Sequence, residues 1–354
     1  MKTVSEECRV FATGDIAADL AEILQGRDPA QVFLLTDDGS RRHCLPLLGE
    51  QPSIPADHVL TIPSSDDHKD YASALAVWQF LSSRGATRRA LLVNLGGGMP
   101  CDLGGFCAAT FKRGVEFVNV PTTLLAQVDA SLGGKTGMNL GSLKNEIGVF
   151  AMASRVLLCA DFLRTLDRGN LLSGFAEMIK HALIRDAAEL DGLLAFSFEK
   201  PDFALLQEMV VRSVRIKEHF VRADPHERGL RKALNFGHTF GHAFETFAMR
   251  HVRPVLHGMA VAHGMVCEIL LSRDKMGLPA DVAEALARRI AAIYGKPQIS
   301  LADADELLEL MTHDKKNDGA GINFTLLPAV GSVEVNQVAA PGEIRKVLED
   351  YLNM

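Results

Sequence analysis

The sequence predicts an α/β domain followed by a mainly α-helical domain. In the first half, short β-rich runs alternate with segments of helical periodicity, which is typical of βαβ units and a parallel sheet. The β-rich runs are apolar almost throughout, as expected for strands covered on both faces. From about Asp167 onward, apolar residues recur mainly at helical spacing. We therefore predict domains over 1–167 and 168–354, with a ligand site in the cleft between them.

The first domain takes its strands and helices from short, well-separated segments. The predicted strands are 31–38 (QVFLLTDD), 58–63 (HVLTIP), 90–98 (ALLVNLGGG) and 116–123 (EFVNVPTT). The segment 70–85 (DYASALAVWQFLSSRG) and the stretch after Asp102 are predicted helices between them.

The second domain is predicted to contain long helices separated by glycine and proline. The helical stretches read LLSGFAEMIKHALI, FALLQEMVVRSVRIKEHFV, LRKALNFGHTFGHAFETF, GMAVAHGMVCEILLS and ADVAEALARRIAAIYG. One late β-rich piece, GINFTLLPAVGSVEV (321–335), predicts a hairpin.

Composition narrows the class of protein. A formal net charge of −7 argues against a general nucleic-acid binder, which usually carries a basic face. We expect no membrane span and no signal peptide, because no apolar stretch is long enough for a span and the N-terminus lacks an apolar core segment. The six cysteines are scattered without a CxxC pair, which favours reduced thiols in a cytoplasmic protein.

Three lysine- or glycine-rich stretches are candidate anion-binding segments. In LLVNLGGGMPCDLGGF (91–106), a strand, a glycine turn and a helix start suit a phosphate, although a plain tight turn explains the glycines equally well. The long segment 120–150 carries Lys135 and Lys144 among glycines, and we interpret it as a binding loop. The run THDKKNDG (312–319), taken alone, is typical of a solvated charged loop.

The histidines of LNFGHTFGHAF (234–244) raise a sharper question. His238 and His242 are four residues apart, so a helix places both imidazoles on one face. They either bind one metal ion together or have different roles. HTFGH lacks the glutamate of HExxH, which excludes the metalloprotease pattern. Glu177 and Lys180 lie three apart in GFAEMIKHAL, either as a surface pair or on a buried face where the carboxylate needs a partner.

These stretches, in this order, resemble the motifs of 3-dehydroquinate synthases. The matching runs are GGGxxxDLGGF, FKRGVEFVNVPTTLLAQVDASLGGKTGMN, LKNEIGVF, GFAEMIKH, RKALNFGHTFGHAFE, LHGMAV and HDKKN. The resemblance implies a Rossmann-like NAD-binding domain followed by a helical domain. It also implies one divalent metal ion, with zinc preferred over cobalt. It implies a homodimeric lyase that converts 3-deoxy-D-arabino-heptulosonate 7-phosphate to 3-dehydroquinate and phosphate, in the shikimate route to chorismate and aromatic amino acids.

The resemblance also assigns roles to single residues. The implied metal ligands are Glu177, His238 and His257, whereas His242 matches a residue of the substrate pocket. The implied NAD residues are Asp37, Asp66, Lys69, Gly97, Gly98, Asp102, Thr122, Thr123, Lys144, Phe162 and Thr165. The sequence departs from the family at Ser65-Asp66, where Gly-Glu is usual, and at Pro100-Cys101 inside the glycine turn.

The implied substrate residues are mostly cationic or amide side chains. They are Arg113, Asp129, Lys135, Lys144, Asn145, Lys217, Arg231, Asn235, His242 and Lys315. The implied catalytic residues are His242, Lys135, Asn145, Lys180, Arg231 and Asn235. Converging cations suit a substrate with a carboxylate and a phosphate.

The implied reaction proceeds by transient oxidation with NAD, phosphate elimination, re-reduction and aldol cyclisation. Its alternatives are another sugar phosphate cyclase, an NAD alcohol dehydrogenase of related fold, and a binding protein without activity. The segment GGKTG…LKN argues against a dehydrogenase, and the substrate residues above argue against a different cyclase.

Overall fold

The computed structural model describes residues 1–6, 9–141, 143–312 and 321–354. It divides into two compact units. Unit 1 comprises Met1–Asp167 with Asp202–Glu218, and unit 2 comprises Arg168–Pro201 with His219–Met354.

The units differ from the predicted domains at one helix. Helix α7 (Phe203–Ala223) begins in unit 1 and ends in unit 2, whereas the sequence placed all of it in the second domain. Its first part is held to unit 1 by Lys217, whose Nζ is 2.6 Å from Asp129 Oδ1. Helical periodicity alone could not show which unit this helix joins.

Unit 1 is built on a sheet with seven described strands in the order β1-β2-β9-β6-β5-β3-β4. Their bounds are Lys2–Ser5 (β1), Val10–Ala12 (β2), Val32–Asp37 (β3), Val59–Ile62 (β4), Leu91–Gly96 (β5), Glu116–Pro121 (β6) and Arg155–Leu158 (β9). Neighbouring strands are parallel except β1 and β2. The predicted parallel sheet and its four predicted strands are confirmed, whereas β1, β2 and β9 were not predicted.

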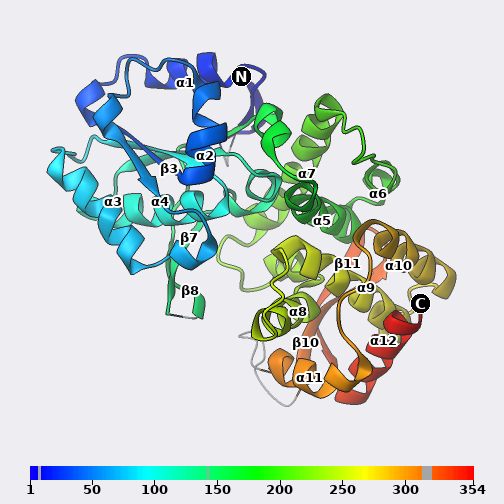
Figure 1. Ribbon diagram of the computed structural model, residues 1–354. Coiled ribbons are helices and arrows are strands. Elements are labelled where there is room, and N and C mark those ends of the chain that lie inside the picture. Colours follow the sequence, from blue (N-terminus) through cyan, green and yellow to red (C-terminus); the bar gives the residue numbers. More distant parts are fainter. Residues whose placement is uncertain (7–8, 142, 313–320) are drawn as a thin grey trace. The chain divides into compact units, whose positions relative to one another are not determined.

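Helices cover both faces of this sheet (Figure 1). Their bounds are Ile16–Leu24 (α1), Asp38–His43 (α2), Tyr71–Ser83 (α3) and Gly98–Thr110 (α4). Leu20 of α1 and Leu34 of β3 share one core cluster. Phe33, the preceding strand residue, contacts Phe80 of α3 with ring centroids 5.9 Å apart. Since successive strand residues point to opposite faces, α1 and α3 lie on opposite sides.

The lysine-bearing stretch 120–150 differs from the predicted loop. It forms a short π-helix (Ala126–Ala130) and an antiparallel hairpin of β7 (Lys135–Leu140) and β8 (Leu143–Phe150). Gly137 and Gly148 stand opposite each other in this hairpin, and a Cβ on Gly137 would lie 2.5 Å from the carbonyl oxygen of Ile147. The glycines that suggested a loop therefore allow two strands to pair closely.

Unit 2 is mainly helical, as predicted. Its helices are α5 (Arg168–Arg185), α6 (Ala187–Leu194), α8 (His238–Arg250), α9 (His257–Met276), α10 (Ala280–Tyr294), α11 (Ala304–Thr312) and α12 (Pro341–Asn353). The predicted late hairpin is confirmed as β10 (Ile322–Ala329) and β11 (Ser332–Ala339). Helix α9 is buried along most of its length, because it packs against α5, α8, α10, α12 and β10.

Helix α9 meets its neighbours at glycines. A Cβ on Gly258 would lie 1.8 Å from the Ser173 carbonyl oxygen of α5, and one on Gly264 would lie 2.0 Å from the Gly237 carbonyl oxygen just before α8. Gly258 N also donates to Ser173 Oγ at 3.1 Å. Because only a hydrogen atom fits at these points, backbone contact sets the separation of α5, α8 and α9.

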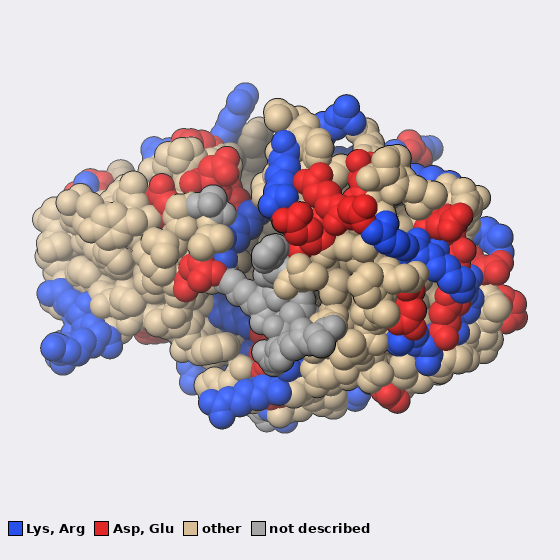
Figure 2. Space-filling model, turned by 90° about the horizontal axis from the view of Figure 1, so that it is seen from below, with Lys and Arg blue, Asp and Glu red and all other residues tan. Residues whose placement is uncertain are grey.

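Charges of both signs share the described surface. On the face shown in Figure 2, Lys and Arg side chains lie among Asp and Glu side chains. Among the described helices, none combines the length and the apolar character that crossing a membrane requires.

His263 should make the stability of unit 2 depend on pH. Its ring, 8% exposed, has Nδ1 2.8 Å from the Tyr351 hydroxyl. Burial lowers the pKa of His263 to about 4, below the value of about 6.5 in an unfolded chain. Stability from the neutral ring is therefore present above about pH 6.5 and is lost as the pH falls toward 4, by up to about 3 kcal/mol.

Urea denaturation of the parent chain and of His263→Asn at about pH 7 and about pH 5 tests this expectation. The free energy of unfolding should fall less in the variant. An equal fall in both chains would contradict the assignment to His263.

Candidate functional site

Three side chains of unit 2 converge as metal ligands do. One ligand atom each of Glu177, His238 and His257 lies within 4.8 Å of the other two. Glu177 Oε1 is 3.7 Å from His238 Nε2 and 3.9 Å from His257 Nε2. Ligands about 2.1 Å from a tetrahedral zinc lie about 3.4 Å apart. The structure thus brings together the three residues that the resemblance implied. Both separations from Glu177 Oε1 are only a few tenths of an ångström longer than those between the ligands of a tetrahedral zinc ion.

Both histidines turn Nε2 toward this point because Nδ1 is held elsewhere. His238 Nδ1 lies 3.1 Å from the Phe236 carbonyl oxygen, and His257 Nδ1 lies 2.9 Å from Glu245 Oε2. A carbonyl or carboxylate oxygen only accepts, so each Nδ1 carries the hydrogen and each neutral ring keeps a lone pair on Nε2. This tautomer is the one that a metal binds through Nε2.

Glu177 supplies the buried negative charge. It lies on α5 with no exposed surface, and its Oε2 pairs with the ammonium of Lys180, which is also buried. No described residue donates a hydrogen bond to Oε1. A buried carboxylate oxygen without a donor is costly unless a cation compensates it. The residues therefore fit a divalent ion, and the Glu177–Lys180 pair belongs to a buried face and not to the surface.

A second buried carboxylate fixes the start of α8. Gly237 precedes the helix with a φ of +80°. Glu268 of α9 accepts from Gly237 N at 2.6 Å and from Thr239 N at 3.2 Å. A carboxylate at a helix N-terminus satisfies amides that have no partner within the helix and interacts favourably with its dipole. Glu268 thereby ties the helix of His238 to the helix of His257.

His242 lies one turn after His238. Its ring centroid is 5.4 Å from that of His238 and 6.0 Å from that of His257. The predicted proximity of the two histidines is confirmed. His242 does not join Glu177, His238 and His257 in the three-ligand group found among the described residues. The geometry favours different roles for His238 and His242.

In unit 1, the predicted nucleotide-binding residues gather at the carboxyl ends of neighbouring strands. Asp37 ends β3, Gly97 and Gly98 follow β5, and Thr122 follows β6. After β3 the chain pairs next as β4 on one side, and after β5 it pairs as β6 on the other. The connections therefore diverge between β3 and β5. Ligands of open parallel sheets bind at such a switch point.

The glycine turn keeps the start of α4 clear. A Cβ on Gly97 would lie 3.1 Å from Thr123 Cγ2, and one on Gly98 would lie 3.1 Å from Ala130 Cβ. No described side chain caps α4, so its N-terminal amides suit a pyrophosphate. Pro100 stands in the first helical turn, where the N–H that proline lacks would have no partner within the helix. The Pro100-Cys101 departure is therefore compatible with the fold of this turn.

Other predicted NAD residues are linked or buried. Asp37 Oδ1 accepts from Ser40 N at 2.8 Å, and Ser40 Oγ is 3.1 Å from Thr122 Oγ1. Thr165 Oγ1 donates to the Phe162 carbonyl oxygen at 2.7 Å. Phe162 is fully buried.

Lys69 connects the predicted NAD and substrate residues. Its Nζ is 2.5 Å from both Asp102 Oδ2 and Asn145 Oδ1. Lys144 Nζ is 3.2 Å from Asp66 Oδ2. The shorter carboxylate of Asp66 still reaches a cation. Burial raises the pKa of Asp102, and the charge of Lys69 opposes this rise.

Asn139, which the sequence analysis did not single out, holds this arrangement together. Its Nδ2 donates to the Asp66 carbonyl oxygen at 2.9 Å, and its Oδ1 accepts from Asn145 N at 3.0 Å. Its own N–H donates to the Lys69 carbonyl oxygen at 2.7 Å. Asn145 has a φ of +54°, which asparagine tolerates better than most residues. No sequence signal pointed to this role, because a polar residue is ordinary in the loop predicted over 120–150.

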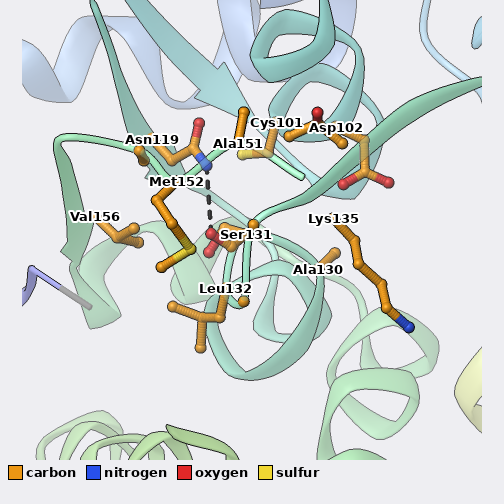
Figure 3. A pocket seen from close by; sticks show the side chains of 14 residues that line it. Cys101, Asp102, Asn119, Ala130, Ser131, Leu132, Lys135, Ala151, Met152 and Val156 are labelled. Carbon is orange, nitrogen blue, oxygen red and sulfur yellow. Dashed lines mark hydrogen bonds between the residues drawn. The ribbon is translucent and has the colours of Figure 1, made fainter. Parts of the chain in front are cut away.

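A small pocket of unit 1 adjoins Asp102 (Figure 3). Asn119 closes one side by donating from Nδ2 to the Ser131 carbonyl oxygen at 3.3 Å. The cavity volume is about 10 Å³, room for about one water molecule and too little for a nucleotide. Lys135 lines the pocket, but its ammonium points away from the other lining side chains.

Two further predicted substrate residues of unit 1 differ in their burial and in their contacts. Lys217 is buried, and its Nζ is 2.6 Å from both the carbonyl oxygen and Oδ1 of Asp129. Arg113 is exposed at a tight turn with a φ of +68°, and none of the described residues forms a hydrogen bond or ion pair with its guanidinium.

In unit 2, Arg231 and Asn235 lie in one 3-10 helix. Arg231 is buried and donates from Nη1 to the Pro225 carbonyl oxygen at 2.7 Å. Asn235 Nδ2 donates to Glu227 Oε1 at 3.0 Å. Lys315, also predicted to bind substrate, lies outside the described residues.

Glu245 is the clearest site residue that the sequence analysis missed. It follows His238 by seven positions and His242 by three, so one face of α8 carries all three side chains. That spacing was the available signal.

Comparisons with known proteins agree over nearly the whole chain. The family model described as 3-dehydroquinate synthase N-terminal matches residues 59–173, and the C-terminal model matches 174–317. The 3-dehydroquinate synthase of Parabacteroides distasonis is 44% identical over 345 residues, which cover 98% of each chain. That of Streptococcus pneumoniae is 35% identical over 338 residues, 92% of this chain and 90% of that one.

Solved structures share the fold at lower identity. A 2-epi-5-epi-valiolone synthase of Streptomyces hygroscopicus, with NAD+ and Zn2+ bound, is 23% identical with a TM-score of 0.80, over 100% of this chain and 98% of that one. A 2-deoxy-scyllo-inosose synthase with carbaglucose-6-phosphate, NAD+ and Co2+ is 23% identical with a TM-score of 0.83, over 96% of each. An iron-containing alcohol dehydrogenase is 14% identical with a TM-score of 0.64, over 98% of this chain and 97% of that one. From the family models and the full-length relatives, we conclude that the chain belongs to the 3-dehydroquinate synthase family.

Proposed function

We propose that this chain converts 3-deoxy-D-arabino-heptulosonate 7-phosphate to 3-dehydroquinate and phosphate, with NAD and one divalent ion, zinc before cobalt. Identity of 44% to a curated synthase over 98% of the chain supports the reaction. The observation that carries the proposal at atomic level is the convergence of Glu177 Oε1 with the Nε2 atoms of His238 and His257. Two solved cyclase structures of the same fold hold NAD+ together with Zn2+ or Co2+, which supports both cofactors.

Each cofactor has a fitting set of residues. Glu177, His238 and His257 would hold the ion. The switch-point residues Asp37, Gly97, Gly98, Asp102, Thr122 and Thr123 would hold NAD, with Asp66, Lys69, Lys144, Phe162 and Thr165 around them. When bound, the ion makes a substrate hydroxyl more acidic, and NAD accepts and returns a hydride.

The protein's own side chains then orient the metal ligands and transfer a proton. Lys180 pairs with one oxygen of Glu177 and leaves the other facing the imidazoles. His242 lies one turn from His238, and a histidine there can carry a proton between substrate and solvent. We assign it the proton relay.

The remaining predicted residues supply the anion contacts. Arg231 offers a planar fork that suits a carboxylate, while Lys135 and Lys144 are point charges that suit a phosphate. Lys217 is fixed against Asp129, and Asn145 is fixed by Lys69. We propose that Arg113, Asn235 and Lys315 complete this set.

Phosphate release is the direct test of the reaction. Purified protein with NAD, zinc and the heptulosonate phosphate should release phosphate and form 3-dehydroquinate without build-up of NADH. A chelator should stop the release, and added zinc should restore it. Release that is indifferent to the chelator would contradict a metal-dependent synthase.

Two alternatives have their own readouts. Steady build-up of NADH absorbance would favour an alcohol dehydrogenase, whose fold this chain shares. Turnover of sedoheptulose 7-phosphate or glucose 6-phosphate in preference to the heptulosonate phosphate would favour a different cyclase.

We also propose a cytoplasmic homodimer. Exposed apolar side chains gather on the β7–β8 hairpin and just after it, including Leu140, Leu143, Phe150 and Met152. A second copy is the occupant that we propose for this surface, because an exposed apolar strand is otherwise prone to aggregate. None of the five described cysteines forms a disulfide, which supports a reducing compartment. Sedimentation of the parent chain and of Phe150→Glu tests the dimer.

A further inference from the structure

We propose that Glu245 is a positioning residue of the metal site, acting through His257 to strengthen the binding of the ion. This inference rests on the metal site of the proposed function. Glu245 comes from α8, whereas His257 is the first residue of α9. The 2.9 Å contact between Glu245 Oε2 and His257 Nδ1 therefore joins two ligand-bearing helices at the site itself.

His257 needs such a partner more than the other ligands do. Its side chain is 30% exposed, against 11% for His238 and 0% for Glu177. It follows a stretch, residues 251–256, that is exposed throughout. The contact with Glu245, whose side chain is 13% exposed, restrains the ring so that Nε2 faces Glu177.

The two imidazoles also have different partners for Nδ1. His238 is oriented by a neutral carbonyl oxygen, that of Phe236, whereas His257 is oriented by a carboxylate. A carboxylate on the far nitrogen makes Nε2 a stronger electron donor to a metal. Glu245 therefore acts on the strength of the ligand as well as on its direction.

The charges at the site lead to the same conclusion. The charge of Glu177 is balanced by Lys180, which is buried against it, and both ligand imidazoles are neutral in the tautomer described above. Glu245 brings a further negative charge, in direct contact with His257. That charge acts through the Nδ1 contact, which makes Nε2 of His257 a better ligand for a divalent ion.

If Glu245 had a purely structural role, its removal would destabilise the metal-free fold. The helices α8 and α9 are already joined by the Gly264 contact and by Glu268. Loss of the Glu245 carboxylate should therefore leave the metal-free fold intact and affect the ion.

The test is zinc affinity, measured by competition with a chelating dye, for the parent chain, Glu245→Gln and Glu245→Ala. We expect zinc to bind about 10- to 100-fold more weakly to Glu245→Ala, with Glu245→Gln between the two, because its amide oxygen still accepts from Nδ1. Thermal unfolding of the metal-free proteins should be unchanged. The visible spectrum of bound Co2+ should shift in both variants.

The matched control is Glu306→Ala. Glu306 Oε2 lies 3.1 Å from His251 Nε2, so this variant also removes a carboxylate from a histidine, but an exposed one that is not a ligand. Its zinc affinity should equal that of the parent. In a His257→Ala background, Glu245→Ala should weaken the residual affinity no further.

Parent-like zinc affinity in Glu245→Ala would overturn the proposal while leaving the metal site standing. An additional loss in the His257→Ala background would also overturn it, because Glu245 would then act by another route. Failure of the proposed function would give a different result. The parent chain would then bind no zinc, or His257→Ala would bind zinc as tightly as the parent.

Discussion

Alanine at His238 is expected to abolish tight zinc binding, whereas alanine at His242 should leave zinc bound and lower the rate of turnover. His238 Nε2 is 3.7 Å from the buried oxygen of Glu177, and the loss of one ligand leaves only two. His242 stands beside the three ligands without joining them. Its removal takes away a proton carrier, an effect of about 10²- to 10⁴-fold on kcat.

The two variants form a matched pair, because both change one histidine of α8 to a good helix former. Zinc content after dialysis and phosphate release per active site are the two measurements. Added zinc should not restore the His242 variant. Equal zinc loss in both variants would show that the two histidines share one role.

Gly258→Ala should destabilise the protein far more than alanine at a glycine with open space around it. The new Cβ would lie 1.8 Å from the Ser173 carbonyl oxygen, a backbone atom that cannot turn aside. Overpacking of this kind costs about 1–3 kcal/mol and sometimes more, and we expect at least about 3 kcal/mol here. Zinc affinity should fall as well, because the contact lies next to His257 and one turn before Glu177. Urea denaturation and dye competition measure the two effects.

Gly342→Ala is the control for helix propensity. Gly342 lies in the first turn of α12, and a Cβ there would meet nothing within 4 Å. Alanine should leave stability unchanged or raise it by up to about 1 kcal/mol. If Gly258→Ala were as mild as this control, the close approach of α5 and α9 would not be what fixes the metal ligands.

The hydrophobic pattern was sufficient for the parallel sheet and for the helical second half. Strands covered on both faces appear as short apolar runs, and helices buried on one face show apolar residues at helical spacing. The prediction failed where this pattern is weak. It missed strands β1, β2 and β9, of 4, 3 and 4 residues, although β4 with 4 residues was predicted. The glycines of β7 and β8 suggested a loop, although they serve close strand pairing.

The functional site, too, could be predicted from the sequence only in part. The convergence of His238 and His242 follows from helical spacing alone. Their separate roles, and the participation of Glu177 and His257, came only from the family resemblance, because spacing cannot show which helices meet. Residues such as Glu245, Glu268 and Asn139 act by holding other residues in place. Their importance lies in contacts across elements, which a single sequence does not display.

The backbone contacts of α9 also bear on how such a protein can change its chemistry. The frame for Glu177, His238 and His257 depends on main-chain atoms that meet at Gly258 and Gly264. Because main-chain atoms make these contacts, exchanging a side chain elsewhere in the site does not remove them. The substrate preference can therefore change while the three metal ligands stay in place. One added methyl group at Gly258 would instead disturb every reaction that depends on those ligands.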